Sequence, residues 1–126
     1  RGSTAVTSSA AQVWEGGQGV CQDYTHLALG ALRSVGLPAR YVSGYLYPGG
    51  AKEPGATVSG ESHSWVEWWC GSWVAFDPTN NIVPSDQYIT LAVGRDFADV
   101  TPLKGVIYGG DHHLLKVSVD VDRIEA

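Results

Sequence analysis

Hydrophobic residues recur every three or four positions between Val20 and Val35. The apolar positions are Val20, Tyr24, Leu27, Ala28, Ala31, Leu32 and Val35. This spacing predicts an α-helix that buries the face on which these residues lie. Gly36 suits the left-handed position after a helix, and Pro38 prevents the helix from resuming. We therefore expect a helix that begins near Cys21, after a glycine-rich approach and a helical turn over residues 10–14.

The rest of the chain shows the patterns of strands and turns. Aromatic and β-branched residues predict strands at 39–47, 62–70, 73–77 and 87–94, and alternation of apolar and polar residues predicts another at 113–121. Residues 48–60 are rich in Gly and Pro, which predicts a surface loop. Gly71 and Ser72 predict a two-residue hairpin. A helix followed by antiparallel strands indicates an α+β fold.

Composition narrows the class of protein. The chain has 126 residues, of which 44% are hydrophobic and 17% charged, and this is typical of one globular domain. A net charge of −5 argues against nucleic-acid binding. No apolar run approaches the ~20 residues of a membrane span, and no signal-peptide pattern is present, so we expect a cytoplasmic protein. The chain lacks Met and begins Arg1-Gly2-Ser3-Thr4, from which we expect a segment of a longer protein.

Cys21 is the candidate nucleophile. It lies in the first turn of the predicted helix, where unpaired backbone N–H groups and the positive end of the helix dipole favour a thiolate over a thiol. Reactive cysteines need such surroundings because the thiolate is the nucleophile. The alternative is that Cys21 is a small buried apolar residue, as most free cysteines are. The other cysteine, Cys70, is expected to be an inert thiol at the end of a strand.

A cysteine nucleophile needs a base, and the base needs a third group that orients it. His63 lies in one predicted strand and Asp77 ends the next, so a helix that starts beside both strands would bring Cys21, His63 and Asp77 together. Alternatively, His63 is a structural histidine of the sheet, and Asp77 forms a turn before Pro78.

The hairpin between these strands provides a test. Opposed residues of an antiparallel pair share a face, and their residue numbers have a constant sum. With a two-residue loop at Gly71 and Ser72 the sum is odd, and His63 and Asp77 fall on opposite faces. The triad hypothesis therefore predicts a loop with an odd number of residues, or a β-bulge.

Asp111, His112 and His113 contain metal-ligating groups. Adjacent residues of a strand alternate between its faces, so these three cannot all hold one ion. The sequence therefore predicts no metal site and no cofactor.

Four stretches together resemble the bacterial branch of the transglutaminase-like superfamily, whose members include transglutaminase-like cysteine peptidases. They are GVCQDYTHLALGALRSVGLPARYVSGYL, SHSWVEW, WVAFDPTNN and AVGRDFADVTPLKG. The resemblance implies a papain-like α+β core in which the nucleophile's helix packs on an antiparallel sheet. It also implies that residues 1–126 form a catalytic domain with Cys21, His63 and Asp77 as its triad, and that an N-terminal domain belongs to the longer protein.

The activity that this resemblance implies is acyl transfer from an amide through a thioester, with water as the acceptor. One alternative is protein-glutamine transamidation, in which an amine resolves the thioester. Another is a binding module that uses the fold without catalysis. The expected partners are a peptide or amide substrate and either the N-terminal domain or a second copy. The second donor of the oxyanion hole stays open, with Gln12, Trp14 and Gln18 as candidates.

Overall fold

The computed structural model describes residues 9–17, 19–47, 55, 57–112, 114, 116–122 and 124. Its elements are α1 (Ala10–Gly16), α2 (Cys21–Ser34), β1 (Ala39–Leu46), β2 (Thr57–Trp69), β3 (Trp73–Phe76), β4 (Tyr88–Gly94), the 3-10 turn η1 (Phe97–Asp99) and β5 (Val119–Asp122). None of the helices in these residues is long and apolar enough to cross a lipid bilayer.

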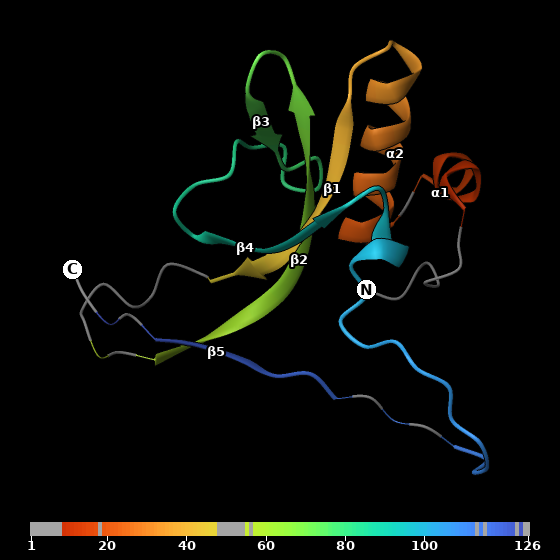
Figure 1. Cartoon of the computed structure of the whole chain (residues 1–126), viewed down its shortest axis with the longest axis vertical. Helices are drawn as coiled ribbons and strands as arrows, with labels where there is room; N and C mark the ends of the chain where they lie inside the picture. Colours follow the sequence, from red (N-terminus) through yellow and green to blue (C-terminus); the bar gives the residue numbers. More distant parts are fainter. Residues whose placement is uncertain are drawn as a thin grey trace.

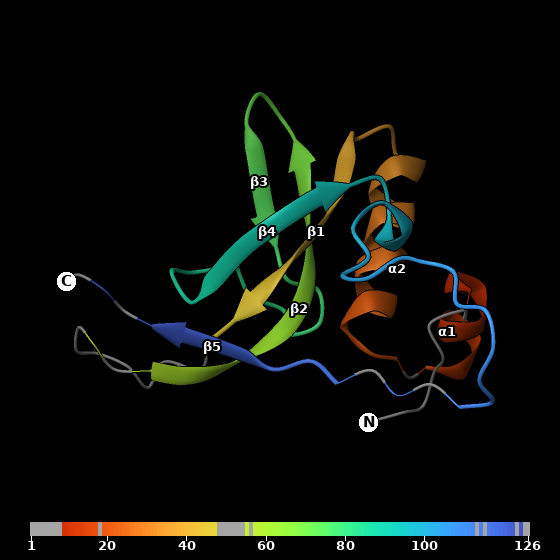
Figure 2. The ribbon, with the colours of Figure 1, turned by 60° about the horizontal axis from the view of Figure 1, so that its bottom comes forward.

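The strands form an antiparallel sheet in the order β3-β2-β1-β4, and β5 pairs with the first residues of β2. The helix α2 packs against one face of this sheet, beside β1 and β2, and α1 lies next to α2 (Figures 1 and 2). The predicted α+β fold, in which the helix that begins at Cys21 packs on an antiparallel sheet, is confirmed. The helical turn predicted at residues 10–14 is the helix α1, which a capping box formed by Ser9 and Gln12 begins.

The buried face of α2 differs from the predicted one. The buried residues of α2 are Asp23, Thr25 and Leu29, whereas Val35 is 73% exposed. Leu29 joins the core of the domain with Tyr41 and Val66, and the predicted positions Ala28 and Leu32 pack only partly against it. The prediction was wrong because α2 packs on the sheet through polar side chains as well as apolar ones. The spacing of hydrophobic residues does not indicate which polar side chains are buried.

Two strand boundaries also differ from the prediction. The sequence predicts a loop at residues 57–60, but they are the first residues of β2, because they pair with β5. The alternating pattern predicts the last strand from residue 113, yet β5 begins at Val119; His113 and Leu115 lie outside the described residues, as do 48–54 and 56. Within β5 the predicted alternation is confirmed, since Val119 and Val121 are partly buried and Asp120 and Asp122 are exposed.

The two central strands are buried on both faces. Tyr41 and Val66 are opposed on the face toward α2, and Val42 and Trp65 are opposed on the other face. Gly44 allows the second face to close, because a Cβ atom at this position would overlap the carbonyl oxygen of Ile89 and lie 2.7 Å from the Trp65 ring. His63, two residues before Trp65 in β2, lies on this second face of the sheet.

Candidate functional site

Cys21 is the first residue of α2. The residue before it, Val20, is extended, and its backbone N–H donates to Oδ2 of Asp23 at 2.8 Å, which closes the first turn of the helix. Gly19 makes room for this turn, because a Cβ there would lie 2.9 Å from Cβ of Asp23. Cys21 therefore has the predicted position, with its N–H in the turn where a helix offers no internal acceptor.

A polar contact joins the first turn of α2 to β2. The Thr25 hydroxyl donates to the carbonyl of Cys21 at 2.8 Å and lies 3.0 Å from the Ser64 hydroxyl. Both side chains are buried. The Cys21 thiol lies beside His63 and Ser64, and both lower its pKa. The structure therefore brings Cys21 beside His63, as the sequence predicts.

The hairpin between β2 and β3 has a loop with an odd number of residues. The two strands end in the pair Trp69 and Trp73, so the loop contains three residues rather than two. The residue numbers of opposed pairs then have an even sum, which places His63 and Asp77 on one face. The predicted two-residue loop is wrong, and the odd loop that the triad hypothesis requires is confirmed. Nε2 of His63 lies 2.8 Å from Oδ2 of Asp77.

Asp77 is completely buried and held by several donors. Its Oδ1 accepts from the backbone N–H groups of Thr79 at 2.9 Å and Asn80 at 3.2 Å. Its Oδ2 accepts from the Asn80 amide at 2.9 Å, from the Tyr88 hydroxyl at 2.6 Å and from His63. Sequence reasoning assigned no role to Asn80 or Tyr88. The turn Pro78–Asn81 could have indicated Asn80, but Tyr88 comes from a distant strand and carries no local signal.

The surroundings of Cys21 and His63 shift the pKa of both groups in the direction that favours a thiolate–imidazolium ion pair. Burial raises the pKa of the Cys21 thiol, but hydrogen bonds from His63 and Ser64 outweigh this effect and hold it below its ordinary value. Burial lowers the pKa of His63, but hydrogen bonds with Cys21 and Asp77 raise it above its ordinary value. A thiolate beside an imidazolium is the form that these shifts favour.

The pKa of Asp77 is lowered despite its burial. Burial raises this pKa, and the hydrogen bonds from Tyr88, His63 and Asn80 together lower it by more. The buried carboxyl therefore stays ionised next to the imidazole. An ionised carboxylate at this position favours the protonated ring of His63 and fixes its orientation.

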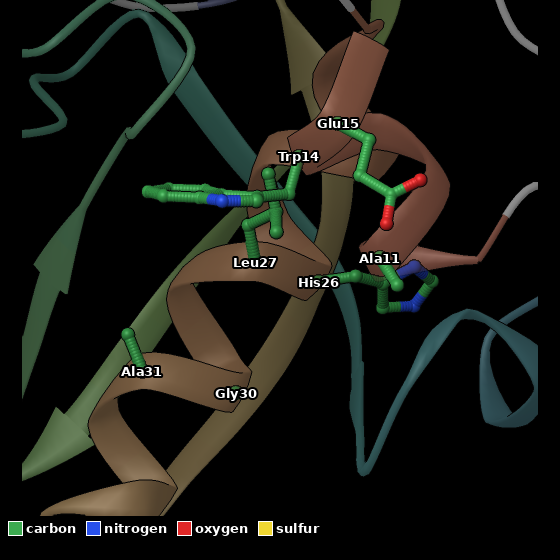
Figure 3. A pocket seen from close by; sticks show the side chains of 7 residues that line it. All are labelled: Ala11, Trp14, Glu15, His26, Leu27, Gly30 and Ala31. Carbon is green, nitrogen blue, oxygen red and sulfur yellow. The ribbon is translucent and has the colours of Figure 1, made fainter. Parts of the chain in front are cut away.

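The other polar candidates lie away from this cluster. His26 accepts a hydrogen bond from the backbone N–H of Phe97 at 3.2 Å, and its ring packs against that of Tyr41 at a tilt of 45°, so it links α2 to η1 rather than supporting Cys21. In Figure 3 it lies in a hollow between α1 and α2, on the side of α2 away from the Trp14 indole, which extends past Leu27. Trp14 is 77% exposed.

Neither of the two described candidates for the second oxyanion donor, Gln12 and Trp14, has a hydrogen bond to Cys21. Oε1 of Gln12 accepts from the backbone N–H of Ser9 at 2.8 Å in the cap of α1, and Gln18 lies outside the described residues. Cys70 is exposed, as its position at a hairpin tip implies. Among the described residues, no three His, Cys, Asp or Glu side chains form a metal-binding group.

Three comparisons place this geometry among known proteins. The family model described as Transglutaminase-like superfamily matches residues 1–78. The Mycobacterium leprae protein ML0607 is 47% identical over 123 residues, which are 98% of this chain and 44% of that protein. A protein-glutamine gamma-glutamyltransferase from Pseudomonas aeruginosa is 33% identical over an alignment of 103 residues, which covers 73% of this chain and 15% of that protein.

The fold has a solved counterpart. A crystal structure named "Putative Cysteine Protease from Cytophaga hutchinsonii" superimposes with a TM-score of 0.72 at 30% sequence identity, over 96% of this chain and 38% of that chain. The chain thus spans less than half the length of each of these three proteins. Its family model, its relatives and its fold agree, and the chain belongs to the transglutaminase-like superfamily.

Proposed function

We propose that this domain is a cysteine-dependent acyltransferase that cleaves amide bonds through a thioester, with water as the usual acceptor. Cys21 is the nucleophile, His63 the general base and acid, and Asp77 the residue that orients His63. The observation that carries the proposal is the position of His63, which lies 2.8 Å from the buried Asp77 carboxylate on one side and lowers the pKa of the Cys21 thiol on the other. A purely structural sheet histidine has no need of both partners.

The reaction begins with the thiolate of Cys21 and the imidazolium of His63. The sulfur attacks the amide carbonyl carbon, and the carbonyl π electrons move to oxygen. The N–H of Cys21, at the start of α2, is placed to donate to this oxyanion. His63 then protonates the departing amine as the C–N bond breaks. Water, deprotonated by His63, attacks the thioester and releases a carboxylic acid and the thiolate.

Thiol labelling tests the proposed ion pair. Iodoacetamide alkylation of Cys21 should have an apparent pKa well below the ~8.5 of a free cysteine, because His63 stabilises the thiolate. At about pH 6 we expect Cys21 to react roughly tenfold or more faster than Cys70. The two thiols fall in different tryptic peptides, since Arg33 and Arg40 lie between them.

His63→Ala is the matched variant in this experiment. It should slow Cys21 at about pH 6 to the rate of Cys70, because the thiolate loses its imidazolium partner. If Cys21 of the wild type reacts no faster than Cys70, or if His63→Ala leaves its rate unchanged, the proposal is wrong. That result would favour a binding module with the same fold.

Transamidation is the second candidate, favoured by the similarity to the Pseudomonas aeruginosa protein-glutamine gamma-glutamyltransferase. A glutamine-containing peptide incubated with the domain, with and without a primary amine, separates the two reactions. Both release ammonia, but hydrolysis leaves glutamate, whereas transamidation joins the amine to the peptide. Cys21→Ala is the control, and both products should be absent from it while the variant stays folded.

A further inference from the structure

Tyr88 reaches the candidate triad from the far edge of the sheet. It is the first residue of β4, which is separated from β2 by β1. Its ring lies against two side chains of β2, edge to face with Trp65 at 5.2 Å and with His63 at 6.0 Å between centroids. Gly44 of β1 carries no side chain between these strands, and the Trp65 ring fills that space. The ring of Tyr88 is therefore held in place by packing.

The Tyr88 hydroxyl and the His63 ring use the same acceptor atom. The hydroxyl donates to Oδ2 of Asp77 at 2.6 Å, and Nε2 of His63 lies 2.8 Å from that oxygen. Hydrogen bonds to a charged acceptor are the strong ones, and each further donor takes up part of the charge on the oxygen. The hydroxyl of Tyr88 thus competes directly with His63 for the carboxylate.

We propose that Tyr88 is a positioning residue of the triad, whose hydroxyl shares Oδ2 of Asp77 with His63 and limits how strongly the carboxylate holds the proton on His63. This inference rests on the proposed function. A carboxylate with fewer donors carries more of its charge toward the imidazolium and holds its proton more firmly. The Tyr88 hydroxyl limits this hold, so that His63 can release the proton to the departing amine.

The surroundings of Asp77 contain few groups that titrate. In the described part of the chain, the titratable side chains in contact with it are His63 of β2 and Tyr88 of β4, and Cys21 of α2 lies on the other side of His63. Thr79 and Asn80, which supply the remaining donors, are neutral. We therefore expect a substitution of Tyr88 to change chiefly the pH at which His63 loses its proton.

Tyr88→Phe removes the hydroxyl and retains the ring. The alkylation rate of Cys21 against pH should rise in two steps for the wild type, first as the thiolate forms and then as His63 loses its proton. In Tyr88→Phe the second step should move to higher pH, on the order of half a unit, because the carboxylate then interacts more strongly with His63. Thermal unfolding checks that the variant is folded.

Two further variants provide a control and a second test. Tyr108→Phe is the matched control, because Tyr108 is 94% exposed and its hydroxyl is remote from Asp77; both steps should stay where they are in the wild type. Asn80→Ala removes the other side-chain donor that competes at Oδ2, so it should shift the second step in the same direction as Tyr88→Phe. It also provides the test if Tyr88→Phe does not fold.

The outcomes separate this inference from the proposed function. A two-step profile for the wild type that is unchanged, or shifted to lower pH, in Tyr88→Phe overturns the role of Tyr88 and leaves the triad intact. A wild-type profile in which Cys21 titrates like the exposed Cys70 overturns the proposed function and the inference with it. A merely structural role for Tyr88 would lower the melting temperature without moving the second step.

Discussion

The hydroxyls of Thr25 and Ser64 lie 3.0 Å apart in the interior of the domain, and they join α2, which begins at Cys21, to β2, which contains His63. Thr25 also donates to the carbonyl of Cys21. Ser64 follows His63 directly and lies beside the Cys21 thiol, whose pKa it lowers. This buried polar contact thus joins the turn that contains Cys21 to the part of β2 that contains His63.

Thr25→Val should destabilise the domain and separate Cys21 from His63. Valine has the shape of threonine but leaves the Ser64 hydroxyl and the Cys21 carbonyl without this partner, which costs about 1–3 kcal/mol of unfolding free energy. Urea unfolding measures the loss. Thr90→Val, at an exposed position of β4, is the control and should change stability little. Equal stability of Thr25→Val and the wild type would mean that the contact contributes nothing.

Asp77→Asn should lower turnover by roughly 10²–10⁴-fold, because the amide does not stabilise the imidazolium of His63 and permits the wrong tautomer. Turnover is measured as ammonia release from the glutamine peptide. Asp86→Asn is the matched control, since Asp86 is an exposed loop residue. Near-normal turnover in Asp77→Asn would remove Asp77 from the triad while leaving the roles of Cys21 and His63 open to the labelling test.

The ionisation of Asp77 should make stability depend on pH in acid. The folded-state pKa of Asp77 is lowered, since the hydrogen bonds from Tyr88, His63 and Asn80 outweigh the effect of burial. A carboxyl of this kind stabilises the fold above its unfolded pKa of about 3.9, and that stabilisation is lost as the pH falls through the folded pKa. The advantage of the wild type over Asp77→Asn in urea unfolding should therefore shrink between about pH 5 and pH 2.

An advantage that stayed constant over this range would show that the pKa of Asp77 is the same in the folded and unfolded states. His63 contributes with the opposite sign: its raised pKa stabilises the fold below its unfolded pKa of about 6.5, and that contribution is lost as the pH rises. The acid range therefore reports on Asp77 and the neutral range on His63.

Two glycines should respond oppositely to alanine. Gly44→Ala should destabilise the domain by roughly 1–3 kcal/mol, because its Cβ would overlap the Ile89 carbonyl and press on Trp65. Gly30→Ala should stabilise it by up to about 1 kcal/mol, since Gly30 is within α2 and its Cβ would meet no atom within 4 Å. Urea unfolding of both variants compares them. If Gly44→Ala is as stable as the wild type, β1 and β4 are not held as closely as the structure has them.

Local sequence determined the elements and the three chemical groups of the candidate site. The start of α2 at Cys21, the strand β1 and the α+β class follow from the spacing of apolar residues, and that pattern acts over a few residues. His63 and Asp77 could be proposed together because His63 lies in β2 and Asp77 directly follows the adjacent strand β3, so parity relates their faces. Even the error in the hairpin loop was open to correction, since the triad hypothesis itself required an odd number of loop residues.

Only the tertiary structure decided which groups support the site. Thr25 and Ser64 are ordinary polar residues in the sequence, and their meeting depends on how α2 settles on the sheet. Tyr88 reaches Asp77 from the far edge strand, and 57–60 become a strand only by pairing with β5. Such contacts join residues that are distant in sequence, and no local pattern encodes them, because their free energy arises only when the chain is folded.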